Sequence, residues 1–323
     1  HRDPASGDDD AGEVEDPWDA PYPLSVTSIS RPVMRVECGS DFSFAITTAN
    51  ELWCWGCNAD GQLGLGHTND VKDAERIDLF GAATPAVSVA AGSRHSMVLT
   101  SELAVYVCGS TGHGRLGLGK AITSTPSINV WTLNGSLSEQ CNSIACGESH
   151  TAAICGGLIM SFGAGSFGRL GHGDLLDTYL PTLVRNFDEV AKQVACGAFH
   201  TVALTTKGRL WSWGTGCPLG YMNDADNSVV SIPRRLNFEF QGPVLQIAAG
   251  PFHTLVLCTQ GRVACWGNGS HGRIGMGPDM SNCPKPKFLA VSQPGAGGGE
   301  FREAILREQI LDICEKKPKA GGG

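Results

Sequence analysis

Short apolar runs, each closed by a glycine, recur along residues 24–291 of the chain. In one representative stretch, the run Val244 to Ala249 leads into Gly250, and the run Thr254 to Cys258 leads into a Gln260-Gly261 turn. Runs of this length, rich in Val, Leu and Trp and bounded by glycine, are typical of half-buried β-strands joined by tight turns. The pattern therefore predicts an all-β chain, and the abundance of glycine, 43 of 323 residues, favours the same turn-rich architecture.

The strands belong to a repeat of about 53 residues that occurs five times. A second glycine marker follows the first by 16 or 17 residues in every copy. The first marker stands at Gly39, Gly92, Gly147, Gly197 and Gly250, and the second at Gly56, Gly109, Gly163, Gly214 and Gly267. Such a unit has an unburied face until a neighbour covers it, and stacking of the units around an axis is the usual solution. The sequence therefore predicts a β-propeller with one blade per repeat.

Several segments resemble the regulator of chromosome condensation repeat, whose unit carries "V-A-C-G-x-x-H-T-x-A-L", then "W-G", then "G-Q-L-G-x-G". The matching segments are VACGAFHTVAL (194–204), WSWG (211–214), IAAGPFHTLVL (247–257) and CWGCNADGQLGLG (54–66). WD repeats are shorter and kelch repeats need a double glycine in every unit, so neither fits. The resemblance covers about residues 24–291 and implies a β-propeller that normally has seven blades. With five repeats visible, either two blades lie outside this sequence, or the ring closes with five, or it stays open.

The segments that flank the repeats differ from them in composition. We expect residues 1–23 to form an acidic disordered tail, because residues 1–19 hold eight acidic residues and one basic residue. The repeats occupy residues 24–292, residues 293–299 form a Gly/Pro linker, and residues 300–319 are predicted to form a short C-terminal helix. This helix either caps the last blade or leads into another domain. Its apolar stripe contains Leu306, Ile310, Ile313 and Cys314.

Charge and cysteine content narrow the classes of partner. The net charge is −8 and no basic stripe is present, so neither nucleic acid nor an anionic membrane is expected to bind. Thirteen cysteines in a chain of this length predict reduced, buried thiols and a cytoplasmic or nuclear protein. Cys54 and Cys57 form a C-x-x-C without a second ligand pair, so we expect no metal and no cofactor. No catalytic triad or carboxylate pair recurs, and no catalytic residue or small-molecule substrate is predicted.

Four of the five repeats carry a histidine three residues after the first glycine. These are His95, His150, His200 and His253. Each lies in its own repeat, so they cannot converge on one metal ion. We interpret them, together with the first-marker glycines, as structural residues that bond the backbone in every blade.

Three arginines share one loop register and are candidate partner contacts. Arg and aromatic residues are common anchors of protein interfaces. The candidate partner-binding residues are Arg115, Arg169 and Arg273, with His113, Phe167 and His271 in a neighbouring register. The alternative interpretation is that each arginine packs its stem and bonds a loop carbonyl.

The resemblance also implies a function. A propeller of this family is expected to act as a regulatory or adaptor module that binds a protein partner. Two more specific activities are guanine-nucleotide exchange on a Ran-type small GTPase and substrate binding within a ubiquitin ligase that carries these repeats. The plant UV-B photoreceptor of this family has tryptophan directly after the first glycine. This chain has Ser40, Ser93, Glu148, Ala198 and Pro251 there, so light sensing is not expected.

Overall fold

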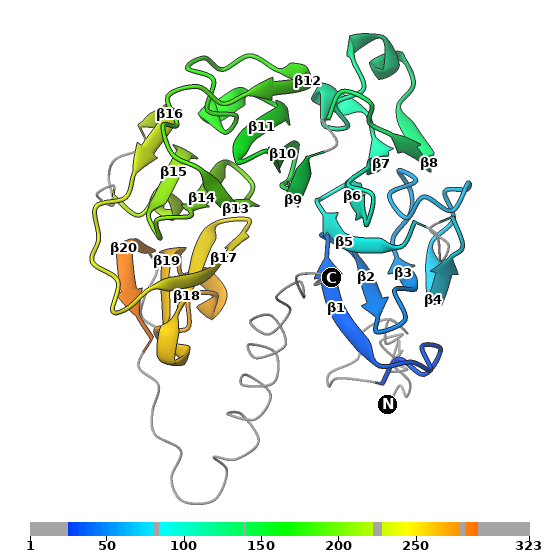
Figure 1. Cartoon of the computed structure of the whole chain (residues 1–323), viewed down its shortest axis with the longest axis horizontal. Coiled ribbons are helices and arrows are strands. Elements are labelled where there is room, and N and C mark those ends of the chain that lie inside the picture. Colours follow the sequence, from blue (N-terminus) through cyan, green and yellow to red (C-terminus); the bar gives the residue numbers. More distant parts are fainter. Residues whose placement is uncertain (1–24, 80–83, 138–139, 222–227, 278–281, 290–323) are drawn as a thin grey trace, which may run out of the picture.

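The computed structural model describes residues 25–79, 84–137, 140–221, 228–277 and 282–289. These residues form five four-stranded antiparallel sheets arranged as the blades of a β-propeller, which confirms the predicted fold class (Figure 1). The predicted acidic tail, linker and C-terminal helix (1–23, 293–299 and 300–319) lie outside the described residues. No helix among the described residues is long and apolar enough to cross a membrane.

Each blade is built from four consecutive strands, in sequence order across the sheet. Blade 1 contains β1 (Val33–Cys38), β2 (Phe42–Thr47), β3 (Leu52–Gly56) and β4 (Val71–Ile77). Blade 2 contains β5 (Ala86–Ala91), β6 (His95–Thr100), β7 (Val105–Ser110) and β8 (Ser127–Leu133). Blade 3 contains β9 (Cys141–Cys146), β10 (His150–Cys155), β11 (Leu158–Gly163) and β12 (Thr178–Leu183). Blade 4 contains β13 (Ala191–Cys196), β14 (His200–Thr205), β15 (Leu210–Thr215) and β16 (Val229–Arg235), and blade 5 contains β17 (Val244–Gly250), β18 (His253–Cys258), β19 (Val263–Asn268) and β20 (Asn282–Phe288).

The core lies between neighbouring blades, where the alternating apolar side chains of facing sheets meet. Between blades 1 and 2, for example, Phe44 and Leu52 pack with Val89 and Val98. The same arrangement recurs between blades 2 and 3, 3 and 4, and 4 and 5. Every inner blade therefore depends on two neighbours for its burial.

The described blades form an open arc, with blade 1 (blue) and blade 5 (yellow to orange) at its two ends (Figure 1). Because no described blade precedes blade 1, Val36 on β1 is much more exposed than its equivalents. Its side chain is 66% exposed, whereas its equivalents in blades 2 to 5 are 3 to 8% exposed. Those equivalents are Val89, Ile144, Val194 and Ile247. The outward face of blade 1 is thus a core surface that no described residue covers.

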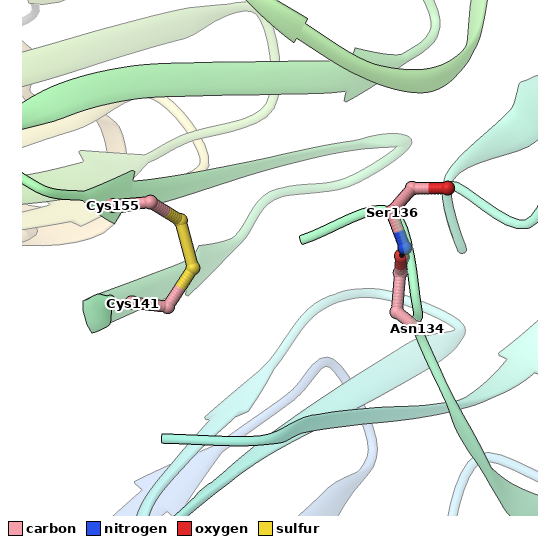
Figure 2. The surroundings of a disulfide bond; sticks show 4 residues. All are labelled: Asn134, Ser136, Cys141 and Cys155. Carbon is pink, nitrogen blue, oxygen red and sulfur yellow. Dashed lines mark hydrogen bonds between the residues drawn. A yellow bond between two sulfur atoms is a disulfide. The ribbon is translucent and has the colours of Figure 1, made fainter. Parts of the chain in front are cut away.

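One cysteine pair departs from the expectation of reduced thiols. Cys141 on β9 and Cys155 on β10 form a disulfide (Figure 2). The two residues lie directly opposite each other in the antiparallel register, which brings their side chains together. The expectation is therefore wrong for this pair, and a sequence separation of 14 residues gave no sign of that register.

Asn134, within an Asn-Gly-Ser sequon shown in the same view, is not available for glycosylation (Figure 2). Its side chain is buried, and its Nδ2 donates a hydrogen bond of 2.9 Å to the Leu116 carbonyl. The backbone N–H of Ser136 donates to Asn134 Oδ1 at 3.1 Å, which closes the turn. This asparagine is therefore part of the scaffold of blade 2.

Candidate functional site

The first-marker glycines bring the inner ends of neighbouring blades into backbone contact. A Cβ atom on Gly147 would lie 2.5 Å from the carbonyl oxygen of Gly197 in the next blade and 2.5 Å from the His150 ring. The backbone N–H of Glu148 also donates a hydrogen bond of 3.2 Å to that carbonyl. Gly39, Gly92 and Gly197 make equivalent contacts with the blades that follow them. These five glycines line a central cavity of about 370 Å³.

Three of the repeated histidines hold one blade to the next. The His150 Nε2 of blade 3 lies 2.9 Å from Thr201 Oγ1 of blade 4. That hydroxyl donates its single hydrogen to the Arg169 carbonyl of blade 3, at 2.8 Å. The histidine must therefore be the donor, and its neutral Nε2–H tautomer is the one that fits. Equivalent bonds join His95 to Thr151 and then Arg115, and His200 to Thr254 and then Pro218.

Burial keeps these histidines neutral. It lowers the pKa of His95 to about 3, with a smaller contribution from the nearby Arg115 charge. Burial, and to a lesser extent His253, lowers the pKa of His200 to about 3, and burial lowers the pKa of His150 well below its usual value. Among the described residues, no group of three or more His, Cys, Asp or Glu side chains is placed to hold a metal ion.

Two of the candidate arginines lie inside the molecule. The Arg115 and Arg169 side chains are buried, with residue exposures of 6% and 3%. Each donates through Nε to a carbonyl of its own loop and through Nη1 to a backbone carbonyl of the next blade, Glu148 at 3.2 Å and Ala198 at 2.7 Å. The bonds to Glu148 and Ala198 connect blades, so these two guanidinium groups offer little surface to a partner.

The third arginine has only part of this arrangement. Arg273 donates to its own loop carbonyl, Ser270, at 2.8 Å, and among the described residues it meets no following blade. In the fourth repeat the loop is two residues shorter, and the Pro218 carbonyl takes the place of an arginine carbonyl. The sequence register alone could not show the role of the Pro218 carbonyl, because the shortened loop shifts the alignment of the fourth repeat.

His113, Phe167 and His271, in the neighbouring register, are exposed on the loop face. This face has two halves that differ in chemistry. Near blades 1 to 3 the face carries polar contacts: Arg94 Nε pairs with Asp60 at 2.6 Å, and His113 Nδ1 lies 2.8 Å from Asp177. Near blades 3 to 5 it carries three neighbouring phenylalanines whose rings are tilted against one another. Phe167 lies 4.8 Å from Phe199, which lies 6.0 Å from Phe252, measured between ring centroids.

We call Phe167, Phe199 and Phe252 the aromatic strip. Phe167 and Phe252 remain 43% and 42% exposed. Arg169 lies 4.8 Å from the Phe199 ring, and Arg273 lies 5.5 Å from the Phe252 ring. Next to the strip is a cavity of about 250 Å³, whose lining includes Phe199, Phe252, Thr215, Pro218, Asn268 and Asn282.

Sequence reasoning singled out Phe167 but missed the other two members of the strip. Phe199 and Phe252 each stand two residues after the first-marker glycine. The same position is Asp41, Arg94 and Ser149 in blades 1 to 3. An apolar, aromatic residue in a register that is polar elsewhere was the available signal. His271, the last of the predicted partner contacts, is also exposed on this face.

Comparison with known proteins decides the family. The model of the RCC1-like domain matches residues 5–301. The chain belongs to the RCC1-like domain family. This confirms the resemblance seen in the repeats.

The RCC1-like chain is similar in sequence to a receptor, a ubiquitin ligase and a guanine nucleotide exchange factor. It is 32% identical to the ultraviolet-B receptor UVR8 of Arabidopsis thaliana, over 85% of this chain and 62% of the receptor. It is 32% identical to the human E3 ubiquitin-protein ligase HERC2, over 83% of this chain and 6% of the ligase. A secretion-regulating guanine nucleotide exchange factor from Bos taurus is 30% identical over 72% of this chain and 51% of that factor. The RCC1-like chain thus spans less than two thirds of each of these relatives.

Solved structures agree with the fold. Human WBSCR16 superposes with a TM-score of 0.71 at 26% identity, over 81% of this chain and 67% of that one. The yeast protein Prp20p, from Saccharomyces cerevisiae, superposes with a TM-score of 0.69 at 20% identity, over 87% of this chain and 72% of that one. At that identity the likeness to Prp20p concerns the fold alone.

Proposed function

We propose that this chain is a protein-interaction propeller, acting as a regulatory or adaptor module, and that the aromatic strip is its partner-binding surface. The observation that carries the proposal is that Phe167 and Phe252 remain more than 40% exposed although each ring lies against Phe199. Three neighbouring aromatic rings on a surface form an apolar patch of the kind that marks interaction sites.

The surroundings of the strip support this role. Aromatic residues and arginine are enriched among the residues that dominate binding energy, and the partly exposed Arg273 lies against the Phe252 ring. Full burial of one phenylalanine side chain contributes about 1.5–3 kcal/mol. The adjacent cavity of about 250 Å³ offers a recess for one large side chain of the partner.

The test is capture of a defined partner by a matched pair of variants. A nucleotide-free Ran-type GTPase is the first partner to try, since one relative is named as a guanine nucleotide exchange factor. Combined Phe199→Ala and Phe252→Ala should reduce capture at least tenfold, while Leu183→Ala, which shortens an exposed side chain on the outer strand β12, should not. Equal capture of the GTPase by the double phenylalanine variant and by Leu183→Ala would show that the aromatic strip is not the partner-binding surface.

Nucleotide exchange is the second candidate function, favoured by that same relative. Release of labelled GDP from the GTPase, with and without the purified chain, tests it directly. Acceleration of release supports exchange activity. Capture of the GTPase without faster GDP release would support the adaptor role and exclude nucleotide exchange.

Substrate binding within a ubiquitin ligase is the third candidate, since similarity to HERC2 covers only a small part of that ligase. Exchange of the matching HERC2 segment for this chain would test it, because ubiquitination of a HERC2 substrate should persist only if the propeller surface is equivalent. We also propose a cytoplasmic or nuclear location and no nucleic-acid, membrane or small-molecule partner, to be checked with a fluorescent fusion and binding assays.

A further inference from the structure

The boundary between blades 4 and 5 differs from the other described boundaries, because no arginine connects its two sides on the loop face among the described residues. Arg94 connects blades 1 and 2, since it pairs with Asp60 of blade 1. Arg115 connects blades 2 and 3, and Arg169 connects blades 3 and 4. The corresponding residue of blade 4 is Pro218, whose side chain has no hydrogen-bond donor.

The backbone at this boundary nevertheless follows the course seen one boundary earlier. The Trp266 indole donates to the Pro218 carbonyl at 2.6 Å, as the Trp213 indole donates to the Arg169 carbonyl at 2.9 Å. A threonine hydroxyl beside each tryptophan donates to the same carbonyl. Pro218 therefore stands at the position of Arg169, and what the boundary between blades 4 and 5 lacks is a guanidinium group.

A cavity lies where that guanidinium group would be. It is the cavity of about 250 Å³ beside the aromatic strip, and it is lined by the loop of blade 4 and by Pro251 and Phe252 of blade 5. Pro251 and Phe252 are the equivalents of Ala198 and Phe199, whose carbonyl and ring receive the Arg169 side chain. The cavity thus keeps the two groups that hold an arginine at the preceding boundary.

The lining also offers hydrogen-bond acceptors. Among the described residues the Pro251 carbonyl receives one hydrogen bond, from the Ala198 N–H at 3.0 Å, and a carbonyl oxygen has two lone pairs. The Phe252 ring is 42% exposed and presents a face to which a cation is attracted. Three polar side chains complete the lining: Thr215, Asn268 and Asn282.

An arginine suits these groups better than a lysine or an apolar side chain. Its planar guanidinium group stacks on an aromatic ring and carries several N–H donors in a fixed fork, whereas the ammonium group of lysine is compact and strongly hydrated. An apolar side chain would cover the Pro251 carbonyl without giving it a donor. The Arg273 charge does not exclude another cation, because Arg115 already lies near both Arg94 and Arg169 on this face.

We propose that the cavity between blades 4 and 5 binds an arginine side chain of the partner protein. This guanidinium group donates to the Pro251 carbonyl and lies against the Phe252 ring, in the place that Arg169 occupies one boundary earlier. The inference rests on the proposed function, since it names the side chain that the partner-binding surface selects.

Peptide pools test the selection on the wild-type chain. Immobilised degenerate peptides with a fixed central arginine should retain the chain about tenfold more strongly than pools with a central citrulline, which has nearly the same shape but no charge. A pool with a central lysine should also be weaker than the arginine pool. Equal retention by the arginine and citrulline pools, or stronger retention by an aliphatic or aromatic pool, would overturn the proposal. Capture of the GTPase would still test the aromatic strip separately.

Matched variants at Pro218 locate the binding site. Pro218→Arg supplies a guanidinium group from within the chain and should abolish the preference for the arginine pool over the citrulline pool. Pro218→Ala leaves the cavity open and should keep that preference. Melting temperatures show that both variants are folded. A preference that persists in both variants, or is lost equally in both, would contradict binding in this cavity.

A second pair of variants gives the same information if a Pro218 variant fails to fold. Phe252→Leu removes the aromatic ring from the cavity but keeps an apolar side chain, and it should reduce retention by the arginine pool about tenfold. Phe167→Leu makes the same change at the other end of the aromatic strip, outside the cavity lining, and should leave this retention unchanged. Equal retention of these two variants by the arginine pool would overturn the proposal.

Discussion

His150 Nε2 and Thr201 Oγ1 lie 2.9 Å apart across the boundary between blades 3 and 4, and neither group has access to water. The threonine hydroxyl also donates to the Arg169 carbonyl, which accepts a further hydrogen bond from the Trp213 indole at 2.9 Å. One hydroxyl thus connects a histidine, a loop and a tryptophan from two blades. The same connection at His95 and His200 explains why the repeat carries a histidine and a hydroxyl residue side by side.

Replacement of this threonine by its isostere tests the connection. Thr201→Val keeps the volume but leaves the His150 N–H without an acceptor and removes one donor from the Arg169 carbonyl. A buried polar group without a partner costs about 1–3 kcal/mol, so the free energy of unfolding measured in urea should fall by that amount. Thr182→Val, at an exposed threonine on β12, is the control and should change the free energy of unfolding by less than about 0.5 kcal/mol.

The neutral histidines also predict acid sensitivity. The pKa of His95 and of His200 is about 3 in the folded protein and about 6.5 in the unfolded chain. Between these values only the unfolded chain takes up the proton, so their stabilisation is complete above pH 6.5 and is lost as the pH falls towards 3. Each histidine should make the free energy of unfolding fall by about 1.4 kcal/mol per pH unit in that window.

The slope is measured by urea unfolding between pH 6.5 and 5. His200→Asn should reduce it by about 1.4 kcal/mol per pH unit, whatever its effect on stability at pH 7. Glu37 acts in the opposite direction, because burial raises its pKa to about 7, and Glu37→Gln should therefore steepen the slope. An unchanged slope in His200→Asn would show that this histidine takes up its proton as readily in the folded protein as in the unfolded chain.

The same glycine-to-alanine change should have different effects on stability at two positions. Gly147→Ala would place a Cβ atom 2.5 Å from the Gly197 carbonyl and the His150 ring, so blades 3 and 4 must separate. Gly135→Ala is the matched change, because no atom lies within 4 Å of the added Cβ. We expect differential scanning calorimetry to show a loss of several degrees for Gly147→Ala and a shift of no more than about 1 °C for Gly135→Ala. Similar melting temperatures would contradict the tight contact between blades.

The repeat made the propeller predictable, because glycine spacing and strand length are local properties of the sequence. Several features depended on contacts between repeats and could not be read locally. The Cys141–Cys155 bond required the register of β9 against β10, and the place of Pro218 required knowledge of how a shortened loop folds. Phe199 and Phe252 could not be predicted from the residues that the copies share, because these two phenylalanines are what distinguishes blades 4 and 5 from the others.

The arginines offer a comparison in which the same residue has two different environments. Arg169 connects blades 3 and 4 through the Ala198 carbonyl, at 2.7 Å, while Arg273 bonds only its own loop among the described residues. Arg169→Met should therefore lower the free energy of unfolding by about 2–4 kcal/mol, since it removes charge-assisted bonds and leaves buried carbonyls without a donor. Arg273→Met, at the edge of blade 5, should cost less than about 1 kcal/mol. Chemical unfolding of both variants checks this, and an equal loss at both positions would mean that the Arg273 side chain is held as firmly as that of Arg169, by residues beyond those that the structure describes.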